Sequence, residues 1–159
     1  MKSETVKKIK DELQNRSSQD LVEFCLHLSK FKKENKELLS YLLFEVHNED
    51  MYIKNVKNYI DNLFENINSK NFYYIRKSVR KILSITKKYI RYSKIKDTEV
   101  QLLLHFCFHL KEFTPSISNS TRLQNIYERQ ILVIKKAIDT LHEDLQYDYK
   151  LELEELFNG

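Results

Sequence analysis

The chain has 159 residues and a formal net charge of +4 at pH 7, with 42% hydrophobic and 31% charged residues. This balance is typical of a globular protein and excludes a disordered chain, so we expect one domain spanning residues 1–159. No apolar run approaches the roughly 20 residues that cross a bilayer, and the first residues lack the apolar segment of a signal peptide. Two cysteines in apolar surroundings suit a reducing compartment, which predicts a cytoplasmic protein.

Glycine and proline are almost absent, since the chain contains only Gly159 and Pro115. Sheets need turns with positive φ angles, which glycine usually supplies, whereas helices capped by Asn, Ser and Asp do not. The composition therefore predicts an all-α fold. It also excludes a P-loop, a dinucleotide-binding turn, a kinase glycine loop and a nucleophile elbow, because each requires internal glycines.

Helical periodicity predicts seven or eight helices along the chain. They are expected at about residues 4–13, 18–31, 35–46, 52–67, 72–92, 98–113 and 122–141, with a last helix to about 157. Ser17 or Ser18 is expected to cap the second helix, and Asp97 or Thr98 the sixth. Such helices pack as antiparallel pairs, either in a compact α-α superhelix similar to HEAT and armadillo proteins in architecture, or in an irregular bundle.

One short segment recurs, because residues 24–31 read FCLHLSKF and residues 106–113 read FCFHLKEF. One interpretation is duplication of a helical unit at about residues 18–45 and 98–130, and the other is chance. Cys25 and Cys107 lie in the apolar stripes of the two copies and are expected to be buried. The histidine two residues later points about 200° away, so one zinc ion cannot bind the cysteine and histidine of either copy.

His105 and His109 form a different pair, four residues apart on one face of the sixth predicted helix. This is the spacing with which a helix presents two imidazoles to a metal ion. The glutamate of an H-E-x-x-H pattern is missing, because position 106 is Phe106, and the sequence shows no third ligand. We therefore expect no cofactor and no catalytic residue, with this pair as the alternative of a metal-binding protein or enzyme.

Charge gives the clearest functional signal, because ten lysines and arginines and no acidic residue lie between Glu65 and Asp97. On the fifth predicted helix, the basic side chains form two adjacent ridges opposite the apolar face. The candidate residues for binding an anion or a partner are Arg76, Lys77, Arg80, Lys81, Lys87, Lys88 and Arg91. Like charges at this spacing repel one another in a helix, and an anionic partner would relieve the repulsion.

These observations predict a non-enzymatic binding or scaffolding module that uses residues 72–94 to meet nucleic acid or an acidic protein surface. Acidic residues gather in the C-terminal segment, from Asp139 to Glu155, which could also pair with the basic helix through self-association. The remaining alternative is a solvated, lysine-rich surface that has no partner.

Overall fold

The computed structural model describes residues 1–159 and contains eight α-helices, one π-helical turn, one 3₁₀ turn and no strand. The all-α prediction is confirmed. None of the helices combines the length and the apolar character that crossing a membrane requires. The helices group into two compact units, Met1–Glu45 and Val46–Gly159, which are described in turn.

The amino-terminal unit contains α1 (Val6–Gln14), α2 (Ser18–Phe31), α3 (Lys33–Ser40) and the π-helical turn η1 (Tyr41–Glu45). Ser17 caps α2 as expected, because its hydroxyl oxygen accepts a hydrogen bond from the backbone N–H of Asp20. Although α2 and α3 pack against each other, α1, α2 and α3 contain no buried residue. The prediction that Cys25 is buried is therefore wrong, since within this unit α2 packs chiefly on the short helix α3 and Cys25 stays exposed.

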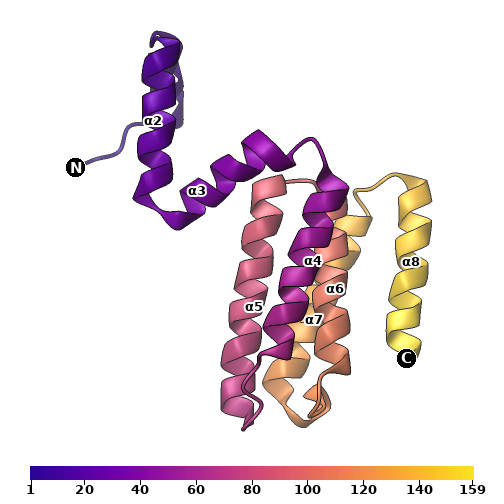
Figure 1. Cartoon of the computed structure of the whole chain (residues 1–159). Helices are drawn as coiled ribbons and strands as arrows, with labels where there is room; N and C mark the ends of the chain where they lie inside the picture. Colours follow the sequence, from indigo (N-terminus) through magenta and orange to yellow (C-terminus); the bar gives the residue numbers. More distant parts are fainter. The chain divides into compact units, whose positions relative to one another are not determined.

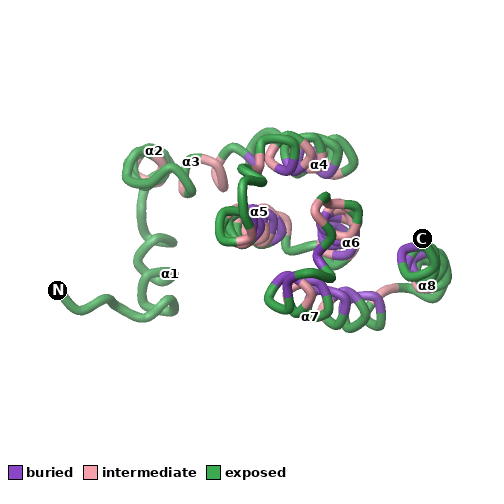
Figure 2. The backbone as a smooth tube through the Cα atoms, turned by 90° about the horizontal axis from the view of Figure 1, so that it is seen from below, coloured by how far each residue is buried: buried purple, intermediate pink, exposed green.

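The carboxyl-terminal unit contains α4 (Glu49–Glu65), α5 (Phe72–Ser93), α6 (Lys96–Glu112), the 3₁₀ turn η2 (Ile117–Asn119), α7 (Thr121–Ile138) and α8 (Glu143–Asn158). Successive α-helices of this unit run in opposite directions, as the antiparallel pairing predicts (Figure 1). Helix α6 packs against α4, α5 and α7, while α8 packs against α7 (Figure 2). This packing is compatible with a compact helical bundle.

The core of the carboxyl-terminal unit forms where the apolar faces of these helices meet. Ile60 of α4, Ile75 of α5, Phe106 of α6 and Ile134 of α7 are all 0% exposed. Burying a side chain of this kind stabilises a fold by roughly 1.5–3 kcal/mol, so these contacts fix the helices relative to one another. Cys107 is also 0% exposed and belongs to this core, as predicted.

Most helices of this unit have an N-cap residue whose side chain accepts a hydrogen bond from the first turn of the helix. Asn48 and Asn71 accept hydrogen bonds from the backbone N–H groups at the starts of α4 and α5. The prediction that Asp97 or Thr98 caps α6 is wrong. Helix α6 begins at Lys96, and its N-cap residue, Ile95, makes no side-chain hydrogen bond. The hydroxyl of Thr98 is buried and donates instead to a carboxylate oxygen of Glu49, at 2.6 Å.

Candidate functional site

A groove lined by five cationic side chains lies between α5 and α7. Its volume is about 470 Å³. It is lined by Arg80, Leu83, Ser84, Lys87 and Arg91 of α5 and by Arg122, Asn125, Ile126 and Arg129 of α7. No carboxylate lines the groove, and none of its five cations forms an ion pair. The groove is therefore a concentration of uncompensated positive charge contributed by two helices.

The local sequence of α5 explains why its basic side chains point away from the core. Its apolar face, which includes Ile75, Val79, Ile82 and Ile90, is buried against the core, so the basic residues of the helix are directed outward. Thr86 lies on the same buried face, where its hydroxyl donates to the carbonyl oxygen of Ile82 at 2.9 Å and leaves no unsatisfied polar group.

The structure divides the seven basic residues singled out from the sequence. Arg80, Lys87 and Arg91 line the groove, whereas Arg76, Lys77, Lys81 and Lys88 do not. Lys77 and Lys81 are exposed, Arg76 is half-buried, and the ammonium group of Lys88 lies 5.2 Å from the centroid of the Tyr89 ring. The basic ridge that contains Arg80, Lys87 and Arg91 thus borders the groove, whereas the adjacent ridge of Lys77, Lys81 and Lys88 lies outside it.

Sequence reasoning missed the contribution of α7. Arg122 and Arg129 are seven residues apart, which places both on one face of a helix after two turns. That spacing was a usable signal, but it could not show that this face of α7 borders the basic ridge of α5. Only the packing of both helices on α6 brings the two sets together.

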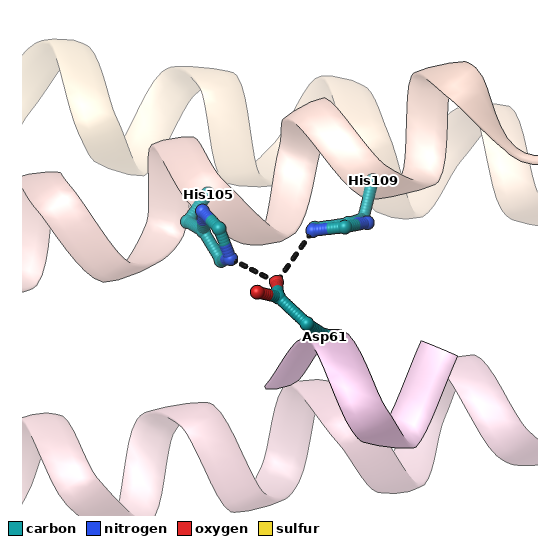
Figure 3. A group of neighbouring side chains, drawn as sticks. All are labelled: Asp61, His105 and His109. Carbon is teal, nitrogen blue, oxygen red and sulfur yellow. Dashed lines mark hydrogen bonds and ion pairs between the residues drawn. The ribbon is translucent and has the colours of Figure 1, made fainter. Parts of the chain in front are cut away.

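A second cluster joins α4 to α6. The Nε2 atoms of His105 and His109 both meet the same carboxylate oxygen, Oδ1 of Asp61, and the His109 contact measures 2.7 Å (Figure 3). The side chains of Asp61, His105 and His109 are 37%, 22% and 27% exposed, respectively. The predicted histidine pair is therefore brought together with an acidic residue that the sequence analysis did not select.

Neighbouring rings hold His109 in place. The ring of Phe64 stacks on it with centroids 5.2 Å apart and planes at 18°. The ring of Phe108 meets the imidazole edge-on at 5.7 Å, and the ring of His105 does so at 4.8 Å. Such contacts favour one orientation of an imidazole over its alternatives.

Burial and charge set the protonation of His105. Burial lowers the pKa of this imidazole from its usual value. The hydrogen bond and negative charge of Asp61 act in the opposite direction, while positive charge on His109 and Lys57 lowers the pKa further. The neutral imidazole, in which one ring nitrogen carries no proton, is therefore favoured.

Two hollows adjoin His105. The larger, about 460 Å³, lies among α4, α6 and α8, and its polar lining includes Lys57, Gln101, Lys111 and Glu152. Burial raises the pKa of the Glu152 carboxyl group, while the charge of Lys57 opposes the rise. A second hollow of about 370 Å³ is lined by residues of α4 and α6 that include Asp61. Water and small solutes therefore have access to the cluster.

Cys107 takes no part in this cluster. Although Cys107 lies between the two histidines in the sequence, its side chain is buried in the core. Burial raises the pKa of its thiol to about 12. Metal ions and electrophiles react with the thiolate, so a thiol that stays protonated is neither a ligand nor a nucleophile.

No family model matches the sequence, no curated protein matches it, and no solved structure matches it.

Proposed function

We propose that the protein is a non-enzymatic module that binds nucleic acid by its phosphate backbone, in the groove between α5 and α7. The observation that carries this proposal is the convergence of Arg80, Lys87 and Arg91 with Arg122 and Arg129 in one hollow that contains no carboxylate. Like charges held this close repel one another, and a chain of phosphates is a partner that neutralises several of them together.

The chemistry of the lining suits phosphate. Four of the five cations are arginines, whose planar guanidinium groups donate two parallel hydrogen bonds to a phosphate. Ser84 and Asn125 add a hydroxyl and an amide, which are further donors that proteins commonly direct at phosphate oxygens. From Arg80 to Arg91 the helix rises about 16 Å, a length that matches several consecutive phosphates of one strand.

An acidic protein surface is the competing partner, and the apolar content of the groove argues against it. Only Leu83 and Ile126 are apolar among the lining residues, and none is aromatic. Stable protein interfaces depend on buried aromatic and aliphatic anchors, whereas contacts with a phosphate backbone do not. No residue of the acidic helix α8 lines the groove, so within one chain α8 does not neutralise it.

The test is fluorescence anisotropy with labelled single-stranded RNA, single-stranded DNA and duplex DNA at low and near-physiological salt. We expect binding that weakens steeply as salt rises. Reversing two charges in the groove, Arg80→Glu with Arg91→Glu, should weaken binding by roughly tenfold or more, a loss of about 1.4 kcal/mol or greater. The pair Arg122→Glu with Arg129→Glu should do the same from the opposite wall.

The matched control is Lys77→Glu with Lys81→Glu, which makes the same change in net charge on the same helix but outside the groove. Its affinity should stay close to that of the wild type. If the control weakens binding as much as the groove variants do, the attraction is a general charge effect and the groove is not the site. If no nucleic acid binds at low salt, the proposal fails, and an acidic protein or the α8 helix of a second copy becomes the partner to test.

A further inference from the structure

The geometry points to a second site: Asp61, His105 and His109 bind a divalent transition-metal ion such as Zn²⁺. Two imidazole nitrogens and one carboxylate oxygen, from α4 and α6, all lie within 4.8 Å of one another. Two histidines and one carboxylate are a ligand set that proteins use for zinc and for iron. The site shares no residue with the groove between α5 and α7, so it stands independently of the proposed nucleic-acid binding.

The three side chains are not only close together but also directed at one another. Both Nε2 atoms point at one oxygen of Asp61, while the other carboxylate oxygen meets neither histidine (Figure 3). One carboxylate oxygen can accept both hydrogen bonds. What the arrangement adds is that both imidazole nitrogens and the carboxylate oxygen face the same small region, so that the three atoms can surround one ion.

An ion fits with small rotations of the side chains. Zinc lies about 2.0–2.1 Å from imidazole nitrogen and about 2.0–2.2 Å from carboxylate oxygen, so tetrahedral ligands are separated by roughly 3.4 Å. In the structure, Asp61 Oδ1 and His109 Nε2 are 2.7 Å apart. Ion binding would replace the two hydrogen bonds to Asp61 by opening these contacts by about 1 Å or less, and it would draw the two imidazole nitrogens, which lie within 4.8 Å of each other, to roughly 3.4 Å.

The residues that support the site are packed into the core. Ile60, next to Asp61 on α4, and Phe106, next to His105 on α6, are both 0% exposed. The ring of Phe64 stacks on His109. Ligands carried on packed helices, and held by neighbouring rings, keep their geometry without the metal and lose little freedom when it binds.

The ligand set also defines the kind of ion and the open positions. Imidazole nitrogen favours transition metals, whereas Mg²⁺ and Ca²⁺ prefer sites made wholly of oxygen. Three protein ligands leave at least one coordination position for water, and the hollows beside His105 give solvent access to it. A site with an open position differs from a closed structural zinc site, which has four protein ligands.

Isothermal titration calorimetry with ZnCl₂ tests this inference on the full chain, purified without a histidine tag and treated with a chelator. We expect one Zn²⁺ per chain with a Kd in the micromolar range or below, and no comparable binding of Mg²⁺. Asp61→Asn preserves the shape of the side chain, and His109→Ala removes one ligand. Each should weaken the binding of Zn²⁺ by roughly 100-fold or more.

The matched control is His27→Ala, which removes an exposed histidine from the amino-terminal unit and should leave Zn²⁺ binding unchanged. Thermal denaturation separates a ligand role from a structural one, since Zn²⁺ should raise the Tm of the wild type and of His27→Ala but not that of Asp61→Asn. Absorption spectra of the Co²⁺-loaded wild type report the coordination without any variant. Stoichiometric binding that survives in Asp61→Asn, or the absence of binding by the wild type, would overturn the inference.

Discussion

The two cysteines have opposite surroundings. Cys107 lies in the core of the carboxyl-terminal unit, whereas Cys25 is exposed on α2. In the folded protein, we therefore expect iodoacetamide to modify Cys25 alone, and to reach Cys107 only after denaturant unfolds the chain. Mass spectrometry of tryptic peptides after short labelling measures both sites. In the Cys25→Ser variant, native labelling should fall close to zero, and equal labelling of both cysteines in the wild type would contradict the burial of Cys107.

The same pair shows what a local pattern can predict about a residue. Cys25 and Cys107 sit at equivalent places in FCLHLSKF and FCFHLKEF, so the sequence gives no reason to treat them differently. Periodicity identifies the apolar face of a helix, but burial also depends on which helices cover that face. Helix α6 is covered by α4, α5 and α7, whereas α2 packs chiefly on the short helix α3.

The cluster of Asp61, His105 and His109 could likewise be predicted only in part from local sequence. The i, i+4 spacing was enough to select His105 and His109, because both lie on one helix and local geometry relates them. Asp61 lies on α4, more than 40 residues earlier, and nothing in its local sequence distinguishes it from the other acidic residues of the chain. Its role follows from the packing of α4 on α6, which depends on the core residues rather than on the site.

At the scale of an element, the end of α5 has an unusual residue. Lys94 adopts a left-handed conformation, with φ 60°, and its backbone N–H donates to the carbonyl oxygen of Ile90 at 2.9 Å. Helices often end in this conformation, and glycine is the residue that adopts it without a steric cost. Since the only glycine of the chain is Gly159, a lysine fills the position here.

Lys94→Gly should therefore stabilise the protein by roughly 0.5–1 kcal/mol, because removing the Cβ atom relieves strain in the folded state by more than it adds freedom to the unfolded chain. Urea denaturation followed by circular dichroism measures the change. Lys94→Ala is the control, since it removes the same charge and keeps the Cβ atom, and it should give no gain. Equal stabilisation by both variants would show that relief of charge repulsion, rather than backbone strain, is the cause.

Elements were more predictable than their boundaries. The number of helices, the span of α5 and the N-cap of α2 followed from periodicity and residue type. The start of α6 did not, because Asp97 and Thr98 are typical capping residues that are used here for other contacts. Asp97 accepts a hydrogen bond from the hydroxyl of Tyr149 on α8, and Thr98 donates to Glu49 on α4. Tertiary hydrogen bonds of this kind override a local preference.

At the scale of the whole molecule, the two units differ in how they are stabilised. The unit Val46–Gly159 contains a core with several side chains that are fully buried, whereas α1, α2 and α3 contain no buried residue. Regions with few buried apolar contacts open at a low cost in free energy. The sequence predicted one domain over residues 1–159, and the relative stability of the two units tests that prediction.

We expect the fragment 46–159 to fold alone and to unfold cooperatively, with a Tm within about 5 °C of the full chain, a shift that corresponds to about 1 kcal/mol. Limited proteolysis of the full chain should first cleave within residues 1–45 and leave this fragment intact. Calorimetry and mass spectrometry provide the two measurements. A fragment that fails to fold, or early cleavage inside α5 or α6, would mean that the whole chain is one cooperative domain.

The order of the helices in the carboxyl-terminal unit also bears on how it folds. The packed pairs α4–α5, α5–α6, α6–α7 and α7–α8 are neighbours along the chain, and α4–α6 skips only one helix. The loops that must close are therefore short, and closing them costs little conformational entropy. Helical proteins dominated by such local contacts fold within microseconds to milliseconds. Each helix can dock on the one before it, so the histidine–aspartate cluster can form once α6 has docked, before α7 and α8 are in place.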